Sequence, residues 1–240
     1  CQPLIHEKVR RQTGVQPAAF QSRPEDKRRV FSDDNLAGIN DVSAVIGGQG
    51  SVLAAKILAE AARSKGWQVR TAETTGMAQR GGDVMSHVRM GNNGEEVFSP
   101  LPGDASDDVI IALEPGEGLR ALHLLKPSGV MVVARSGVAP TVGDFKSPSY
   151  DPAKMIEALQ ASGAHVVVVD DVALCGALGS RQALNIIMLA SALKAVNAPE
   201  SQSALRGVLT LDDMRAVVPA CVKERFVEMN LRAVSLVEGV

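Results

Sequence analysis

A glycine-rich turn is the first stretch whose residue types could do chemistry. Gly47-Gly48-Gln49-Gly50 follows the apolar run at 42–46 and precedes residues 51–62, where apolar residues recur at helical spacing. Glycine has no Cβ, so the backbone there can come close to a ligand or to a packed neighbour. The free N–H groups of a first helical turn also attract anions. The stretch predicts a strand, a turn and a helix, with the turn either binding an anion or only packing the helix against the strand.

A dinucleotide fingerprint is one interpretation of this turn. Glu73 ends the next predicted strand, at a distance from Gly50 that suits contact with a ribose hydroxyl. The fingerprint needs a further glycine at position 53, however, and this chain has Leu53 there. The spacing therefore disfavours nicotinamide or flavin nucleotide binding, and a tight packing turn is the simpler interpretation.

A second polar stretch, residues 74–83, follows that strand. It contains Met77, Gln79 and Arg80 among several glycines. Open α/β sheets bind ligands outside the carboxyl ends of their strands, and an arginine can clamp a phosphate or carboxylate with two hydrogen bonds. The alternative is a subunit-contact loop whose arginine pairs with an acid of a partner. Together with His87, these stretches give the candidate cofactor-binding or cleft-lining residues: Gly47, Gly48, Gln49, Gly50, Met77, Gln79, Arg80, Gly81, Gly82 and His87.

The remaining reactive side chains form no complete catalytic set. His87 lies in the middle of a predicted strand, a position typical of a hydrogen-bonded core or rim histidine. The other histidines have no acidic or cysteine neighbours at ligand spacing, so no metal site is predicted. Asp170 and Asp171 end a strand, where capping of the next segment competes with acid–base work. The catalytic residues therefore stay unassigned.

The elements that must position these residues alternate between strand and helix from Asp41 onward. We predict strands over residues 42–46, 67–73, 84–90, 95–99, 108–113, 129–134 and 164–170. We predict helices over residues 51–62, 118–125, 152–161, 181–196 and 211–218, and a last helix with Val222 to Leu236 along one face, with a loop over 135–151. This order indicates an α/β fold with a doubly wound, mainly parallel, Rossmann-like sheet. One antiparallel hairpin is expected near residues 84–99, across the turn Gly91-Asn92-Asn93-Gly94.

Composition limits the class of protein. Residues 1–39 mix prolines with charges of both signs and are predicted to be an extended or disordered N-terminal arm before a domain at 40–240. A net charge of −2 and an aromatic content of 3% disfavour nucleic-acid binding. The sequence contains no apolar run of about 18 residues, so no membrane span is predicted. Three widely spaced cysteines suit a reducing cytoplasm and are too few for this chain alone to hold an iron–sulfur cluster.

Several motifs together resemble one family. These are the glycine turn, the stretch Glu73-Thr74-Thr75-Gly76-Met77-Ala78-Gln79-Arg80-Gly81-Gly82, and Ser86-His87-Val88-Arg89. Further likenesses are Ser99-Pro100-Leu101, Ala112-Leu113-Glu114-Pro115, and the late helices near 185–193 and 230–233. In this order, over about residues 41–237, they resemble the gamma-type domain of 2-oxoacid:ferredoxin oxidoreductases, and most of all the indolepyruvate ferredoxin oxidoreductase beta subunit.

The resemblance implies an accessory subunit in a hetero-oligomeric enzyme. A partner subunit would carry thiamine diphosphate, Mg and [4Fe-4S] clusters, and would decarboxylate an aryl, indolepyruvate-like 2-oxoacid. Electrons would pass to ferredoxin, and coenzyme A would take up the acyl group. This chain would hold no cofactor alone and would supply a wall of the cleft and an assembly surface. Two alternatives stay open: a self-sufficient nucleotide-binding Rossmann oxidoreductase, and a non-catalytic interaction protein of the same fold.

Overall fold

The computed structural model describes residues 41–48, 50–75, 84–91, 96–137, 141–142, 145–146 and 150–240. The predicted arm lies outside these residues, so the division into 1–39 and 40–240 stays a prediction. The described strands are β1 (Asp41–Gly47), β2 (Gln68–Thr75), β3 (Val84–Gly91), β4 (Asp107–Ala112), β5 (Leu125–Ala134), β6 (Thr141–Val142), β7 (Phe145–Lys146) and β8 (His165–Val169). The described helices are α2 (Ser51–Ser64), α3 (Pro115–Ala121), α4 (Pro152–Ala161), α5 (Asp171–Leu178), α6 (Leu184–Val196), α7 (Leu211–Cys221) and α8 (Glu224–Glu238). Two short 3-10 helices are η3 (Leu122–Leu124) and η4 (Arg181–Ala183).

Six strands form the main sheet, in the order β2-β3-β1-β4-β5-β8. β1, β4, β5 and β8 pair in parallel, whereas β3 runs antiparallel to both β2 and β1. The three strands β1, β4 and β5 are apolar along most of their length because helices cover both of their faces. The predicted α/β class, with a mainly parallel sheet and one antiparallel hairpin, is confirmed.

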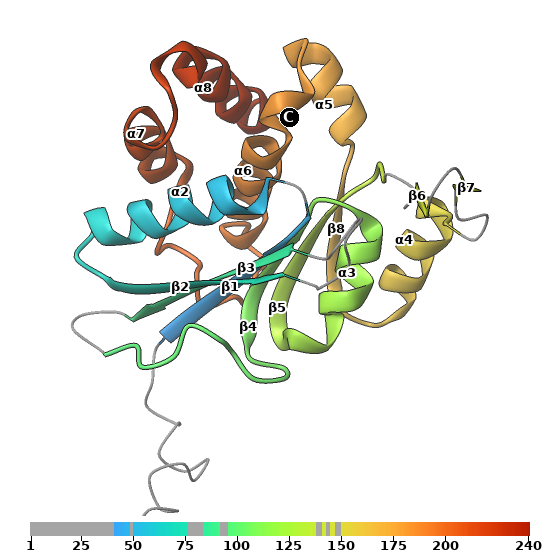
Figure 1. The fold of residues 1–240 in the computed structure, drawn as a ribbon. Coiled ribbons are helices and arrows are strands. Elements are labelled where there is room, and N and C mark those ends of the chain that lie inside the picture. Colours follow the sequence, from blue (N-terminus) through green and yellow to red (C-terminus); the bar gives the residue numbers. More distant parts are fainter. Residues whose placement is uncertain are drawn as a thin grey trace, which may run out of the picture. The chain divides into compact units, whose positions relative to one another are not determined.

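Helices lie on both faces of the sheet, but unequally (Figure 1). α2, α6, α7 and α8 pack with one face around a large core that includes Ile46, Ile111 and Ile187. α3 and α4 cover the other face over a smaller core built around Val45, Ile110 and Leu159. Alternate residues of β1 and β4 enter the two cores, as the two-residue period of a strand requires. No described helix is both long and apolar enough to cross a membrane.

The structure corrects three details of the predicted elements. Residues 96–99 form no strand, and the antiparallel hairpin is made by β2 and β3 instead. The segment at 96–99 is held to the sheet by side chains, since Arg70 Nε donates to Val97 O (3.1 Å) and Arg89 Nη1 donates to Ser99 O (3.4 Å). The predicted loop at 135–151 contains the short pair β6–β7, and α5 was not predicted.

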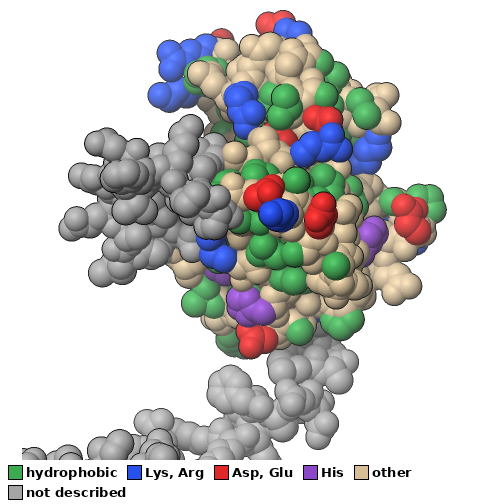
Figure 2. All heavy atoms as spheres, turned by 90° about the vertical axis from the view of Figure 1, so that its right-hand side faces the viewer, with side chains coloured by type: hydrophobic (Ala, Val, Ile, Leu, Met, Phe, Trp, Pro, Cys, Tyr) green, Lys and Arg blue, Asp and Glu red, His purple; other side chains and the backbone are tan. Residues whose placement is uncertain are grey.

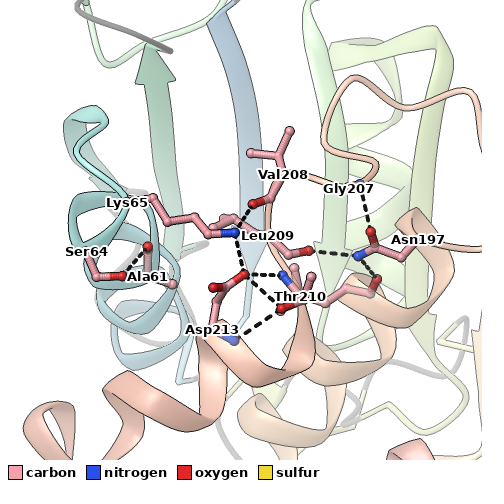
Figure 3. A network of polar contacts seen from close by, with 10 residues as sticks. Ala61, Ser64, Lys65, Asn197, Gly207, Val208, Leu209, Thr210 and Asp213 are labelled. Atoms are coloured by element: carbon pink, nitrogen blue, oxygen red, sulfur yellow. Dashed lines mark hydrogen bonds and ion pairs between the residues drawn. The ribbon is translucent and has the colours of Figure 1, made fainter.

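A polar network fastens the end of α2 to the start of α7 (Figure 3). Lys65 Nζ donates to Val208 O (2.7 Å) and to Asp213 Oδ2 (2.8 Å). Asp213 and Thr210 form a capping box at the start of α7. Asn197 holds the preceding connection, because its Nδ2 donates to Leu209 O (2.8 Å). The helix that follows the glycine turn is therefore fixed at its far end as well as by its buried face.

The strand order places a topological switch point between β1 and β4. From β1 the chain passes through α2 to β2 on one side, whereas β4 lies on the other side of β1. Connections that leave in opposite directions open a crevice at the carboxyl ends of the two strands, where ligands of α/β proteins bind. A ligand-binding site is therefore expected at this edge of the sheet.

Candidate functional site

The glycine turn lies at this carboxyl edge and is closely packed. Gly48 has φ +108° and Gly50 has φ +98°, values that side chains strongly disfavour. A Cβ on Gly48 would lie 2.9 Å from Leu113 Cβ, and one on Gly47 would lie 3.1 Å from Glu117 Cβ. Backbone bonds fix the turn, because Leu113 N donates to Gly47 O (2.9 Å) and Gly48 N donates to Val84 O (3.1 Å). Close packing therefore accounts for both glycines: Gly47 lies against Glu117 of α3, and Gly48 lies against Leu113, just after β4.

A cleft of about 270 Å³ opens next to this turn. It is lined by residues from the connections that follow β1, β4 and β5 and from the start of α6: Gly50, Leu113, Glu114, Ser136, Gly137, Arg181, Gln182, Leu184 and Asn185. Asn185 closes the floor between two helix starts, since its Nδ2 donates to Gly50 O (3.3 Å). The cleft therefore lies at the switch point, where the topology predicts a ligand.

A buried carboxylate organises one wall of the cleft. Asp171 is fully buried, and its Oδ1 accepts a hydrogen bond from Ser136 N (2.9 Å). Its Oδ2 accepts from Ser136 Oγ (2.5 Å) and lies 3.5 Å from Arg181 Nη2. Arg181 Nη2 also donates to Ser136 Oγ (3.1 Å). Asp171 thus compensates the positive charge of Arg181 and holds its guanidinium at the cleft, where it can meet an anionic group.

Glu114 is the carboxylate in the lining of the cleft. Glu114 Oε2 accepts a hydrogen bond from Tyr150 Oη (3.2 Å). Burial, together with the charge of Glu114, raises the pKa of Tyr150 to about 12, so the phenol stays protonated and keeps donating. One turn along, Glu117 Oε1 pairs with Arg120 Nη2 (2.5 Å), whereas its buried Oε2 has no hydrogen-bond partner. The cleft lining thus contains a cation, Arg181, and a carboxylate, Glu114.

The structure places the sequence-predicted residues in different surroundings. Gly50 lines the cleft, and Gly47 and Gly48 form the packed turn behind it. Gln49, Met77, Gln79, Arg80, Gly81 and Gly82 lie outside the described residues, so their assignment stays a prediction.

His87 is buried in the middle of β3 and is not part of the cleft lining. Its Nε2 lies 3.3 Å from Thr74 Oγ1, and its Nδ1 has no partner. Burial lowers the pKa of His87, which favours the neutral imidazole. A histidine kept neutral inside a sheet is suited to packing and hydrogen bonding rather than to carrying charge.

Sequence reasoning missed the polar centre of the cleft. Ser136 and Asp171 each lie two residues after the end of a strand, β5 and β8, and that position was the available signal. Of the two aspartates considered as caps, Asp170 does cap α5, accepting from Ala173 N (3.0 Å), while Asp171 turns inward to Ser136. Within the described part of the chain, no three His, Cys, Asp or Glu side chains gather as a metal site would require.

Comparisons with known proteins identify the family of this chain. The model of the pyruvate ferredoxin/flavodoxin oxidoreductase family matches residues 41–237. The indolepyruvate oxidoreductase subunit IorB of Archaeoglobus fulgidus is 31% identical over 201 residues, which are 82% of this chain and 92% of that protein. The corresponding subunit of Thermococcus kodakarensis is 28% identical over 200 residues, which are 82% of this chain and 93% of that protein.

A solved structure shares the fold. The keto/oxoacid ferredoxin oxidoreductase gamma subunit of Geobacter sulfurreducens superposes with a TM-score of 0.57 at 21% identity, covering 82% of this chain and 95% of that one. The resemblance found in the motifs is therefore confirmed by sequence and by fold. The chain belongs to the pyruvate ferredoxin/flavodoxin oxidoreductase family.

Proposed function

We propose that this chain is the accessory subunit of a thiamine diphosphate-dependent aryl 2-oxoacid oxidoreductase that passes electrons to ferredoxin and forms an acyl-CoA. The family match over residues 41–237 carries the proposal. The relatives named as indolepyruvate oxidoreductase subunits support an aryl 2-oxoacid as the substrate. Each match covers more than nine-tenths of the relative's length. In this proposal the chain works in a hetero-oligomer in the cytoplasm, and its cleft forms one wall of a shared site.

The chain's own residues do not fit the cofactors of such an enzyme. A [4Fe-4S] cluster takes four thiolates, and this chain has three cysteines, of which Cys175 and Cys221 are buried in separate helices. Among the described residues, no group of three His, Cys, Asp or Glu side chains could hold a metal ion such as Mg. We therefore assign thiamine diphosphate, Mg and the clusters to the partner subunit.

The described cleft is suited to positioning rather than to bond making. Arg181 can meet an anionic group of coenzyme A, of the oxoacid or of the partner subunit, while Asp171 keeps the guanidinium in place. Glu114, hydrogen-bonded to Tyr150, can accept from a donor on the opposite side. A wall of this kind fixes the orientation of a ligand whose reacting atoms are held by another subunit.

Co-purification with activity tests the proposal. We expect the tagged full-length chain, isolated from its native cells, to bring down a larger subunit that contains thiamine diphosphate and iron–sulfur clusters. The complex should reduce ferredoxin in the presence of indolepyruvate and coenzyme A. A monomeric protein without such a partner would contradict the proposal. Micromolar binding of NAD(P) or flavin by the isolated chain would instead favour the self-sufficient oxidoreductase.

A pair of variants in the assembled complex tests the role of the cleft. Arg181→Gln removes the cation from the cleft, whereas Arg135→Gln removes a neighbouring exposed arginine that pairs with Asp170 outside it. We expect Arg181→Gln to raise the KM for coenzyme A or the oxoacid, or to weaken subunit association, by roughly tenfold or more. Arg135→Gln should behave as wild type. Equal behaviour of the two variants would show that the cleft has no such role.

A further inference from the structure

The two edges of the main sheet differ in how they are protected. β2 carries Arg70 and Glu73, both exposed, and charged side chains on an edge strand discourage pairing with another strand. β8, at the other edge, reads His-Val-Val-Val-Val and contains no lysine, proline or acidic residue. Among the described strands β8 pairs with β5 alone, through a regular ladder from Val130↔His165 to Ala134↔Val169. Its outer row of backbone N–H and C=O groups therefore faces away from the sheet without the usual protection.

An apolar groove runs beside this edge. It has a volume of about 610 Å³ and is lined by valines of β8 and by side chains of α5, α6 and α8, among them Leu174, Ala195 and Leu236. Val240, which is 85% exposed, lies at its rim. Figure 2 looks at the side of the molecule on which β8 lies and shows hydrophobic side chains exposed between scattered charged ones. A mainly apolar groove next to an open strand edge indicates a protein contact.

We propose that β8 pairs antiparallel with β8 of a second copy of this chain, across a two-fold axis perpendicular to the sheet. The charges on the two edges select this occupant. Pairing of β8 with the β2 edge of another copy would bring Arg70 and Glu73 against an apolar surface, at a desolvation cost. Pairing of β8 with itself brings no charged strand residue into the ladder and sets β-branched side chains opposite each other, which stabilises a sheet.

The register follows from the pleat of the strand. A two-fold axis perpendicular to the sheet keeps each face on its own side, and opposite residues of an antiparallel pair point to the same face. A residue of β8 must therefore lie opposite its own copy. Centring the pair on Val167, the middle residue of β8, gives the longest ladder and sets Val166 opposite Val168. Because the groove lies on one face, the two copies of the groove would meet on that face and cover each other's apolar lining.

Disulfide trapping tests this pairing. Opposite Cα atoms of an antiparallel pair are about 4.5–5.5 Å apart, within the range of about 4.4–6.8 Å that a disulfide spans. Residues 166 of the two copies would be offset by two positions along the strand, roughly 8 Å apart, which is too far. Cysteine replaces valine with little change in size, so the variants should keep the fold.

The experiment uses the full-length chain with Cys1→Ser, purified alone and with any subunit that co-purifies. Cys175 and Cys221 are buried and stay in place. We expect Val167→Cys to give a disulfide-linked homodimer in more than half of the protein after mild oxidation. Val166→Cys and Val168→Cys should stay near the parent's background, as should Thr71→Cys, a control on the exposed β2 edge.

The same variants can overturn the proposal. Failure of Val167→Cys to exceed the Thr71→Cys background in either preparation would exclude the pairing, provided that circular dichroism shows a folded protein. Cross-linking at 166 or 168 but not at 167 would exclude this register, and a disulfide to a different polypeptide would assign the edge to that partner. As an independent measurement, the parent should have the mass of a dimer of this chain in solution, and Val167→Lys, which sets like charges opposite each other, should halve it.

Discussion

Substitution of Gly48 by alanine is the sharpest test of why the glycine turn contains glycine. Gly48 has φ +108°, and an added Cβ would lie 2.9 Å from Leu113 Cβ. Leu113 Cβ is attached directly to the backbone that follows β4, so it cannot move aside by a change of rotamer. The variant therefore combines an unfavourable backbone conformation with a steric overlap.

The magnitude follows from these two effects. A non-glycine residue in this backbone region costs about 1–3 kcal/mol, and overpacking a core adds about 1–3 kcal/mol. The lower entropy of the unfolded alanine chain offsets about 0.4–1 kcal/mol of this. Gly66→Ala is the matched control, because Gly66 has φ +82° and nothing lies within 4 Å of its added Cβ. The difference between the two variants isolates the overlap, and we expect it to be about 1–3 kcal/mol.

Urea unfolding followed by circular dichroism measures this difference. We expect Gly48→Ala to unfold at clearly lower urea than Gly66→Ala, with similar m-values. Gly50→Ala should resemble the control, since Gly50 has φ +98° but its added Cβ meets Asn185 Cβ at an ordinary 3.5 Å. If Gly48→Ala and Gly66→Ala have the same free energy of unfolding, the close packing of the turn on Leu113 does not explain the glycine.

Three further predictions concern polar groups. Asp171→Asn should cost about 1–3 kcal/mol in urea unfolding, because an amide cannot accept from both Ser136 groups and balance Arg181; Asp170→Asn, which keeps a good cap, should cost far less. Burial lowers the pKa of His87, so the contribution of this residue to stability is complete above about pH 6.5 and is lost as the pH falls below that value. We expect His87→Phe to reduce the change of melting temperature with pH in thermal unfolding. Although burial opposes the shift, hydrogen bonds from Lys65 and Thr210 lower the pKa of Asp213 below its ordinary value of 3.8. The contribution of Asp213 to stability is therefore present above pH 3.8 and is lost on further acidification. We expect Asp213→Asn to lose less stability than the wild type when the protein is titrated with acid.

Much of the fold could be predicted because its signals are local. The strand, glycine turn and helix at 42–62 were recognised from adjacent residues, and the predicted helix at 152–161 coincides with α4, which starts with a capping Asp151 and Pro152. The predicted return strand at 95–99 was wrong. A hairpin-like sequence such as 91–94 predicts that the segments on its two sides pair with each other, but the partners of β3 lie elsewhere in the chain. β3 pairs with β2 and β1, which precede it in the chain.

The polar centre of the cleft could not be predicted in the same way. Ser136, Asp171 and Arg181 meet through separations of 35 and 45 residues, and no periodic pattern relates them. α5 was missed because it is short, with eight residues, and follows a strand end that already looked complete. Pairing of the strands in space, rather than any spacing in the sequence, brings these side chains together.

The unequal covering of the sheet has a consequence for how the molecule opens. Leu159 is the one fully buried residue described within α4, whereas α6 buries most of its surface in the large core. Segments with few buried contacts unfold locally at a free energy below that of global unfolding. Amide hydrogens of α4 should therefore exchange with solvent well before those of α6. Tyr150, just before α4, supports Glu114, so one wall of the cleft can loosen while the sheet and the opposite wall stay intact.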